Sequence, residues 1–307
     1  MSEVRFDGRV AIVTGAGGGL GRAHALLLAS RGAKVVVNDL GGSRDGTGAG
    51  GSAMADKVVQ EIKDAGGEAV PNYDGVDTYE GGENIVKTAL DAFGKVDILI
   101  NNAGILRDRA FHNLTEEDWD KVVAVHMKGS FNVTQPAFRA MRQNSYGRIV
   151  FTTSGAGIFG NFGQTNYSAA KMAVCGMMNT LKLEGAKYNI HANTIAPIAA
   201  SRLTEDILPP QIMDKLQPEL VSPMVCYLCS EECAESGSIF TAGGGHFGRA
   251  AMVEGPGTFI AGEPPTLEQI RENLDKIKDM TNASEFKDVN AENLARVMPS
   301  LQKGASA

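Results

Sequence analysis

The chain has 307 residues, of which 43% are hydrophobic, and a formal net charge of −7. This length and composition allow one large α/β domain or two small ones. The acidic balance argues against a nucleic-acid partner, because proteins that bind polyanions usually present a basic face. No apolar run approaches the roughly 20 residues of a membrane span, and the first residues lack the apolar core of a signal peptide. The last three residues do not match a Ser-Lys-Leu peroxisomal address. We therefore expect a cytoplasmic protein that binds neither nucleic acid nor membrane.

The four cysteines predict neither a disulfide framework nor a metal site. Disulfide frameworks are typical of small secreted domains, whereas this long chain carries only Cys175, Cys226, Cys229 and Cys233. The last three invite a zinc interpretation, but residues 223–229 form an apolar, helix-like run in which cysteine acts as a small hydrophobic side chain. We expect no bound metal.

The N-terminal region has the pattern of a strand, a glycine-rich turn and a helix. Residues 9–13 form a short apolar run, as in a strand buried on both faces of a parallel sheet, and residues 22–30 are compatible with a helix. Between them lie Gly15, Gly19 and Gly21. Glycines at such a turn let the backbone approach a pyrophosphate, and the N-terminus of the next helix offers it unpaired N–H groups. The pattern predicts dinucleotide binding.

A second buried strand, residues 34–39, ends in an acidic residue. Asp39 follows the glycine turn at about the distance, roughly 20 residues, expected for the carboxylate that accepts the hydroxyls of the adenosine ribose. A carboxylate there repels a 2′-phosphate, so NAD is favoured over NADP, although Arg44 argues the other way. Arg44 lies within residues 41–51, which hold six glycines and cannot form regular structure cheaply. Whether this stretch is a flexible insertion stays open.

Strands and helices continue to alternate, and ligands in such sheets gather at the carboxyl ends of the strands. The later strands are predicted at residues 69–74, 96–100, 149–152, 192–195 and 238–241. The glycine turn and the strand ends supply the expected cofactor contacts Gly15, Gly19, Leu20, Gly21, Asp39, Asp74, Gly75, Val76, Asn102, Ala103 and Gly104. The loop-like segment 198–210 could cover a bound cofactor, and the contacts expected there are Pro197, Ala199, Ala200, Ser201 and Thr204.

Residues 154–171 carry the predicted chemistry. Tyr167 and Lys171 stand four apart in a helix-compatible run and would share one helix face. A free tyrosine has a pKa of about 10, but a fixed positive charge beside it favours the phenolate, and a pKa lowered by about two or three units gives a usable general base. Ser154 lies just past the apolar run 149–151, where a hydroxyl at a strand end can face that helix.

The composition changes beyond Gly255, where glycines and prolines mark a connector. Thr266 and Gln269 fit a helix capping box. Four apolar residues then recur at helical spacing and form a narrow stripe, which packs either on its own domain or on a partner subunit. The residues of this stripe are Leu267, Ile270, Leu274 and Ile277. We expect a domain boundary near residue 250, with residues 1–250 holding the cofactor and catalytic sites and residues 251–307 forming an extension.

Four motifs, taken in order, resemble the short-chain dehydrogenase/reductase family. They are Thr14-Gly-x-x-x-Gly-x-Gly21, Asn101-Asn-Ala-Gly104, Ser154, and Tyr167-x-x-x-Lys171. The resemblance spans residues 9–245. It implies a Rossmann-type doubly wound parallel sheet of about seven strands with helices on both faces, here followed by a C-terminal helical extension. It also implies an NAD-dependent oxidoreductase that forms a homodimer or homotetramer.

A closer resemblance is to the dehydrogenase unit of the peroxisomal multifunctional enzymes of fatty-acid β-oxidation and its stand-alone relatives. It rests on residues 37–42, 102–109, 160–164 and 201–204. It implies oxidation of (3R)-hydroxyacyl-CoA to 3-ketoacyl-CoA with NAD. The alternatives are a steroid dehydrogenase or a 3-oxoacyl reductase of the same family, and, from another class, a non-catalytic NAD-binding scaffold.

The resemblance also implies roles for individual residues. Tyr167 takes the hydroxyl proton as hydride leaves for the nicotinamide, Ser154 holds the substrate oxygen, and Lys171 lowers the tyrosine pKa and binds the nicotinamide ribose. His126 stands where the wider family commonly has an asparagine that helps a water relay protons. Histidine can also relay protons and titrate near neutrality, and the alternative is a histidine that only packs in its helix. Candidates for contacting CoA phosphates are Arg107, Arg109, Lys128 and Arg202.

Overall fold

The computed structural model describes residues 2–47, 50–199, 215–260 and 264–304 of the chain. The chain divides into two compact units, Met1–Arg249 and Ala250–Ala307. The larger unit carries the sheet, and the smaller one carries two helices.

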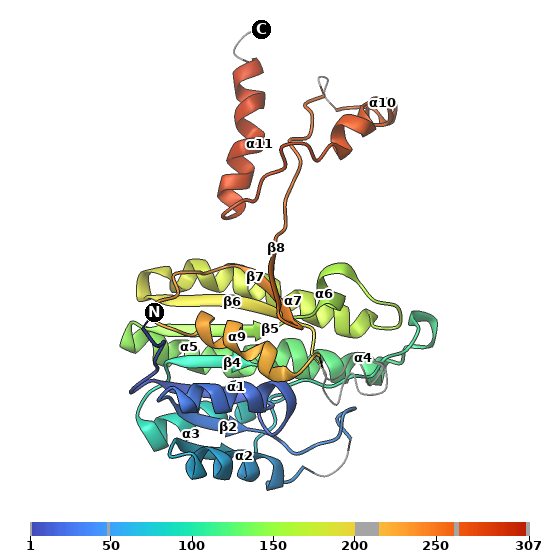
Figure 1. Ribbon diagram of the computed structural model, residues 1–307. Coiled ribbons are helices and arrows are strands. Elements are labelled where there is room, and N and C mark those ends of the chain that lie inside the picture. The colour runs from blue at the N-terminus through green and yellow to red at the C-terminus, as the bar shows by residue number, and fades with distance from the viewer. Residues whose placement is uncertain (1, 48–49, 200–214, 261–263, 305–307) are drawn as a thin grey trace. The chain divides into compact units, whose positions relative to one another are not determined.

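The larger unit is built on a sheet of eight strands among the described residues, with helices on both faces (Figure 1). The strands lie in the order β3-β2-β1-β4-β5-β6-β7-β8, and neighbours from β3 to β7 pair in parallel. The order reverses between β1 and β4, which is where sheets of this kind bind ligands. The strands are β1 Val10–Thr14, β2 Lys34–Asn38, β3 Glu68–Asn72, β4 Ile98–Asn101, β5 Gly147–Thr152, β6 Ile190–Pro197, β7 Ile239–Gly243 and β8 His246–Ala250.

The eighth strand extends the roughly seven strands that the sequence predicts. It follows β7 across Gly244 and Gly245, whose φ angles of 57° and 83° are positive. So short a connection joins antiparallel neighbours, because parallel strands need a long crossover. None of the β8 residues is fully buried. An exposed strand does not need a continuous apolar run, and the β8 sequence lacks the run that is typical of the central strands.

Helices cover both faces because a parallel sheet must be buried on each side. Buried residues of α1, α2 and α9 form one hydrophobic cluster with alternate strand residues such as Ala11 and Val13 of β1. Ile12 is equally buried and faces the opposite side, where α3, α5 and α7 pack. Burying each such aliphatic side chain contributes about 1.5–3 kcal/mol. The helices of this unit are α1 Gly19–Ser30, α2 Ala53–Asp64, α3 Tyr79–Phe93, α4 Glu116–Val123, α5 Gly129–Asn144, α6 Gly155–Phe159, α7 Thr165–Gly185 and α9 Ser222–Leu228, with a π-helical turn η2 at Ala124–Lys128 and short 3-10 turns η1 Phe111–Asn113, η3 Ala186–Tyr188 and η4 Pro218–Leu220.

The smaller unit contains α10 Leu267–Lys278 and α11 Val289–Gly304. The capping box predicted at Thr266 and Gln269 is confirmed, since each side chain accepts a hydrogen bond from the other residue's backbone N–H. The apolar stripe of α10 is not buried within this unit, because its four side chains are between 38% and 84% exposed. Packing of the stripe on the larger unit or on a partner stays a prediction. Nowhere in the described parts of the chain does a helix have both the length and the apolar character needed to cross a bilayer.

Candidate active site

The glycine turn between β1 and α1 is packed too tightly for larger residues. Gly15 and Gly19 have positive φ angles of 63° and 52°. A Cβ on Gly15 would lie 2.8 Å from Ala103 Cα, and a Cβ on Gly21 would lie 2.3 Å from the Gly15 carbonyl oxygen. No side chain caps the first turn of α1, so its N–H groups are available to an anion. The turn therefore fits the pyrophosphate of a dinucleotide.

Thr14 and Asn102 fasten this turn to the end of β4. The Asn102 side-chain amide donates to the carbonyl oxygens of Thr14 and Gly15, at 3.0 and 3.1 Å. The Thr14 hydroxyl in turn accepts from the backbone N–H groups of Asn102 and Ala103, at 3.0 and 3.1 Å. Asn102 therefore shapes the cavity floor as well as lining it. The sequence analysis did not assign this role to Thr14, although its place between a buried strand and the glycine turn is a usable signal.

Asp39 lies at the carboxyl end of β2 and is only 7% exposed. One carboxylate oxygen accepts from Gly17 N and the other from Gly41 N, both at 2.8 Å. These bonds hold the carboxylate at one end of the cavity.

The end of β3 is held by a group of amide side chains. The carboxylate of Asp74 accepts from Asn72 at 2.8 Å and from Asn84 at 3.2 Å. The Val76 carbonyl oxygen accepts from the buried Asn132 side chain at 2.8 Å. Neither Asn84 nor Asn132 was predicted as a site residue, because each acts through a contact that is distant in sequence.

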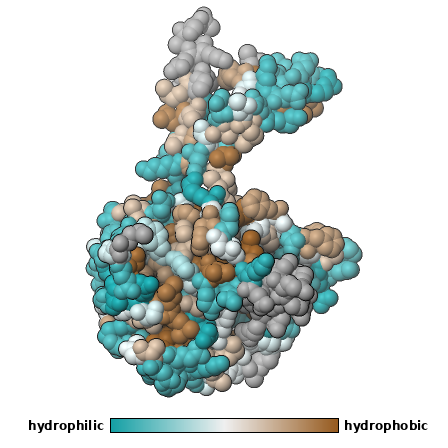
Figure 2. Space-filling view, in the orientation of Figure 1, coloured by the Kyte–Doolittle hydropathy of each residue, from teal (hydrophilic) through white to brown (hydrophobic). Residues whose placement is uncertain are grey.

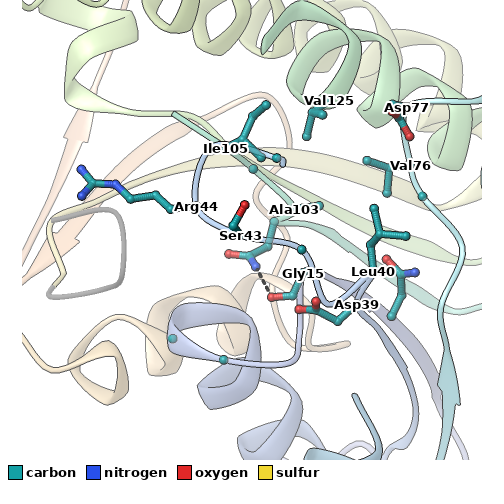
Figure 3. Close-up of a pocket in the computed structure, with 18 of the residues that line it drawn as sticks. Gly15, Asp39, Leu40, Ser43, Arg44, Val76, Asp77, Ala103, Ile105 and Val125 are labelled. Carbon is teal, nitrogen blue, oxygen red and sulfur yellow. Dashed lines mark hydrogen bonds between the residues drawn. The ribbon is translucent and has the colours of Figure 1, made fainter. Parts of the chain in front are cut away.

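A cavity extends from the glycine turn along the carboxyl ends of β1, β2, β3 and β4 (Figure 3). Most of the predicted cofactor contacts line it, namely Gly15, Gly19, Leu20, Asp39, Asp74, Gly75, Val76, Asn102, Ala103 and Gly104. Lining residues that the sequence analysis missed include Ser43, Lys121 and Val125. Residues 41–51, hereafter the glycine loop, contribute to the wall through Gly42, Ser43, Arg44 and Gly46.

Among the described residues, the remaining predicted cofactor contacts do not line this cavity. Gly21 lies beneath the turn, against Gly15. Pro197 ends β6, and Ala199 is buried in the hydrophobic cluster on the α1 side of the sheet. Ala200, Ser201 and Thr204 lie outside the described residues, as does Arg202.

Ser154 and Tyr167 are brought together by α6 and α7. Ser154 caps α6, accepting from Ala156 N at 3.1 Å, and its hydroxyl is close enough to Tyr167 to affect the pKa of that phenol. Burial raises the pKa of Tyr167 to about 12; the Ser154 hydrogen bond lowers it in part, and the Asp108 carboxylate raises it further. The phenol is therefore neutral at pH 7.

Lys171 lies on the same helix, and its Nζ atom is 5.6 Å from the centre of the Tyr167 ring. Nζ donates to the Thr152 carbonyl oxygen at 2.6 Å. Burial lowers the pKa of Lys171 from 10.5 to about 7. The sequence analysis expected the lysine to lower the tyrosine pKa, whereas in this structure desolvation dominates both groups. Burial disfavours the charged form of each group.

His126 sits in the π-helical turn η2 and is buried. Its Nε2 atom lies 3.1 Å from Ile105 N and 2.8 Å from Ile105 O, while Nδ1 has no partner. Its ring meets the Tyr167 ring edge-on, with centroids 5.1 Å apart. Burial, and then the charge of Lys171, hold the pKa of His126 well below its ordinary value. The histidine therefore does not titrate near neutrality as the sequence analysis allowed.

Arg107 and Arg109, two candidates for CoA phosphates, are paired with an acid. Arg109 Nε donates to Asp118 at 2.7 Å, and Arg107 Nη1 lies 3.0 Å from Glu117 and 3.4 Å from Asp118. Only 13% of the Arg107 side chain is exposed, against 56% for Arg109. Arg107 is therefore a structural cation, while Lys128 is exposed at the end of η2.

Asn166, which the sequence analysis missed, connects this acidic cluster to the catalytic helix. Its side-chain amide donates to the carbonyl oxygens of Arg107 and Asp118, at 3.0 and 3.2 Å. Its own oxygen accepts from Tyr167 N at 2.8 Å. Asn166 is fully buried, so it fixes the start of α7 against residues 107 and 118.

Cys175 packs within α7, where its Sγ donates weakly to the Lys171 carbonyl oxygen at 3.8 Å. All four cysteines are buried and free. Within the described part of the chain, no three metal-ligating side chains come together.

The site combines a glycine turn that fits the pyrophosphate of a dinucleotide with a serine–tyrosine pair, and a lysine lies one helical turn from the tyrosine. The model of the short chain dehydrogenase family matches residues 9–206, and the chain belongs to that family. A Mycobacterium tuberculosis chain named as a short-chain type dehydrogenase/reductase is 56% identical over 275 residues, which cover 90% of this chain and 96% of the relative. Peroxisomal multifunctional enzyme type 2 of Mus musculus is 54% identical over 285 residues, which cover 92% of this chain but only 38% of the mouse enzyme.

Solved structures agree with this assignment. The full-length peroxisomal multifunctional enzyme type 2 from Drosophila melanogaster matches with a TM-score of 0.82 and 41% identity, covering 98% of this chain and 50% of the fly chain. A 7α-hydroxysteroid dehydrogenase complexed with NADH and 7-oxo glycochenodeoxycholic acid matches with a TM-score of 0.71 and 30% identity, covering 78% of this chain and 95% of that one. The chain is an oxidoreductase that uses a nicotinamide cofactor.

Proposed function

We propose that this chain is an NAD-dependent dehydrogenase that oxidises (3R)-hydroxyacyl-CoA to 3-ketoacyl-CoA. The observation that carries the proposal is the placement of Ser154 beside Tyr167, with Lys171 one turn along the same helix. Ser154 follows the carboxyl end of β5, and Tyr167 packs against the hydrophobic cluster of Ile105, a residue that lines the glycine-floored cavity.

In the proposed reaction Tyr167 takes the proton of the substrate hydroxyl while the carbon that bears it loses a hydride. Ser154 donates a hydrogen bond to the same oxygen and holds it as the carbonyl forms. When bound, oxidised nicotinamide supplies the hydride acceptor and a positive charge that favours the phenolate. The buried ammonium of Lys171 is the protein's own source of positive charge at the phenol.

We assign His126 a supporting place in proton transfer. The only free atom of its ring, Nδ1, is buried without a partner, so it can hold a water molecule beside the phenol. Its other nitrogen keeps the loop after β4 in place through Ile105.

The choice of NAD over NADP rests on Asp39. Its buried carboxylate occupies the end of the cavity where the adenosine ribose is expected, and a 2′-phosphate would meet a like charge there. Replacing Asp39 by serine removes that charge, so we expect the ratio of kcat/KM for NAD to that for NADP to fall by at least about tenfold. An unchanged ratio would contradict this assignment.

The (3R)-hydroxyacyl-CoA assignment is supported by the resemblance of residues 37–42, 102–109 and 160–164 to the dehydrogenase unit of the multifunctional enzymes. The extensive identity with the mouse type 2 enzyme agrees with it. The steroid alternative is favoured by one observation, the likeness to a hydroxysteroid dehydrogenase, at the lower identity of 30%.

The decisive test is a steady-state panel of (3R)- and (3S)-hydroxyacyl-CoA thioesters of several chain lengths, with NAD and NADP. We expect NADH formation from the (3R) series alone. Turnover of hydroxysteroids with none of the thioesters would favour the alternative, and no turnover across a broad alcohol panel would favour a cofactor-binding scaffold.

We further propose a homodimer or homotetramer in the cytoplasm. Figure 2 shows separate hydrophobic patches among hydrophilic residues on the visible face of the larger unit, and such patches are usual where copies associate. Light scattering coupled to size exclusion would decide between one, two and four copies.

A further inference from the structure

The described part of the glycine loop is organised by hydrogen bonds. At its base, Gly51 N donates to Leu40 O at 2.9 Å. Within it, the Asp45 carboxylate accepts from the Ser43 hydroxyl at 2.6 Å and from Thr47 N at 3.0 Å. These bonds lower the pKa of Asp45 below its usual range. The loop is thus a closed turn whose two ends meet.

One side of this turn forms the cavity wall, to which Ser43 and Arg44 belong (Figure 3). A Cβ placed on Gly46, whose φ is 76°, would lie 3.2 Å from Ile105 Cδ1, so the loop backbone rests directly on residue 105. Leu106 N donates to the Arg44 carbonyl oxygen at 3.1 Å. The loop is therefore docked on the segment that follows β4.

The charged side chain of Arg107 adds to this docking. Arg107 Nε donates to the Asp45 carbonyl oxygen at 2.9 Å, while Nη1 of the same guanidinium bonds Glu117 and Asp118. The acids hold Nη1 of the guanidinium, and its Nε donor reaches the loop. A charged donor makes a stronger hydrogen bond than a neutral one.

We propose that Arg107 is a positioning residue for the cofactor, which acts by holding the glycine loop against the adenosine end of the dinucleotide. The proposal rests on the proposed use of NAD. The wall that Arg107 supports stands on the same cavity as Asp39, so ordering the loop in advance lowers the entropy cost of binding the adenosine half. Arg107 touches neither the reacting atoms nor the cavity itself.

The test compares Arg107→Met with Arg109→Met. Both changes remove a cation from Asp118, but only the first removes a bond to the loop. Calorimetry with ADP-ribose, which lacks nicotinamide, should show affinity falling about tenfold in Arg107→Met, the loss expected for one charge-assisted bond. The KM for NAD should rise by a similar factor with kcat within about twofold, since the lost interaction is the same in ground and transition states. Arg109→Met should leave ADP-ribose affinity within about twofold.

A second variant, Asp45→Ala, tests the role of the loop through one of the loop's own residues. Asp45→Ala removes the carboxylate that organises the exposed turn without touching Arg107 or the core, so it should fold normally and weaken ADP-ribose binding as Arg107→Met does. Hydrogen exchange of the loop amides should be slowed by ADP-ribose in the wild type and much less in either variant.

Unchanged ADP-ribose affinity in Arg107→Met or Asp45→Ala would overturn the inference, as would an equal loss in Arg109→Met. These outcomes differ from failure of the proposed function, in which the wild-type protein itself would bind neither NAD nor ADP-ribose.

Discussion

Replacing Tyr167 by phenylalanine should abolish turnover and leave the fold and NAD binding intact. The change removes one oxygen atom, which lies beside Ser154, so even if a hydrogen bond is lost the decrease in stability should stay within about 1.5 kcal/mol. Acid–base catalysis by a positioned side chain contributes about 10²- to 10⁴-fold, and we expect kcat to fall by at least that much. Among the described residues no second tyrosine is shown in contact with Ser154, so no other phenol should take over the role of Tyr167.

The pH dependence follows from the same group. Burial raises the pKa of Tyr167 to about 12, and a general base must lose its proton, so the rate of alcohol oxidation should rise with pH up to the pKa of the complex. A cationic cofactor lowers that pKa, so the midpoint should fall below 12 in kcat profiles. Tyr167→Phe should have no such limb.

The assays are NADH formation, NAD binding by calorimetry and thermal unfolding. Tyr188→Phe is the matched control, because that phenol lies on the surface, bonded to Arg142, and its loss should change none of the three readouts. Substantial remaining activity in Tyr167→Phe, or a normal pH limb, would refute the assignment of Tyr167 as the base.

Three further predictions concern residues around the catalytic helix. Burial lowers the pKa of Lys171 from 10.5 to about 7, so between these pH values the unfolded chain binds more protons than the folded protein, and stability should rise with pH from 7 to 10.5. Lys171→Met should therefore raise the Tm at pH 6 while abolishing activity. A lower Tm in this variant would contradict the expectation. Gly104→Ala places a Cβ 2.5 Å from the His126 ring and should cost about 1–3 kcal/mol in urea unfolding, whereas Gly176→Ala, with open space around it, should not destabilise. Asn166→Ala breaks two bonds to backbone carbonyls and one from the catalytic tyrosine, so kcat should fall with the Kd for NAD unchanged; an equal effect on both would mean that Asn166 supports the fold in general.

The sequence predicted the elements whose signal is local. The runs 9–13 and 96–100 are apolar enough to be buried on both faces, and they proved to be adjacent strands of the switch point. Gly94 ends α3 with a positive φ of 80°, as a glycine after a periodic apolar pattern indicates. By contrast, β8 is an exposed edge strand with no apolar alternation, so nothing in its five residues distinguishes it from a loop.

Properties of the site that depend on burial or on distant partners could not be derived in the same way. The spacing of Tyr167 and Lys171 places them on one helix face, but the sign of the tyrosine pKa shift depends on how much water the fold excludes. Arg107 was one of four candidates for contacting CoA phosphates, with a solvated surface charge as the alternative, and its pairing could not be foreseen because its acidic partners become neighbours only when α4 folds beside residue 107. Asn166 carries no signal in sequence beyond its place before the catalytic tyrosine.

The hydrogen bonds between Thr14 and Asn102 separate the ordering of the cavity floor from the binding of the cofactor. They make the floor rigid, and the entropy cost of ordering it is incurred when the protein folds, before any ligand arrives. The glycine loop has no hydrophobic core of its own and opens at much lower cost. Entry and exit of the dinucleotide should therefore be governed by the glycine loop. Because product release limits turnover in many enzymes, the residence time of the reduced cofactor would then depend on residues far from the atoms that react.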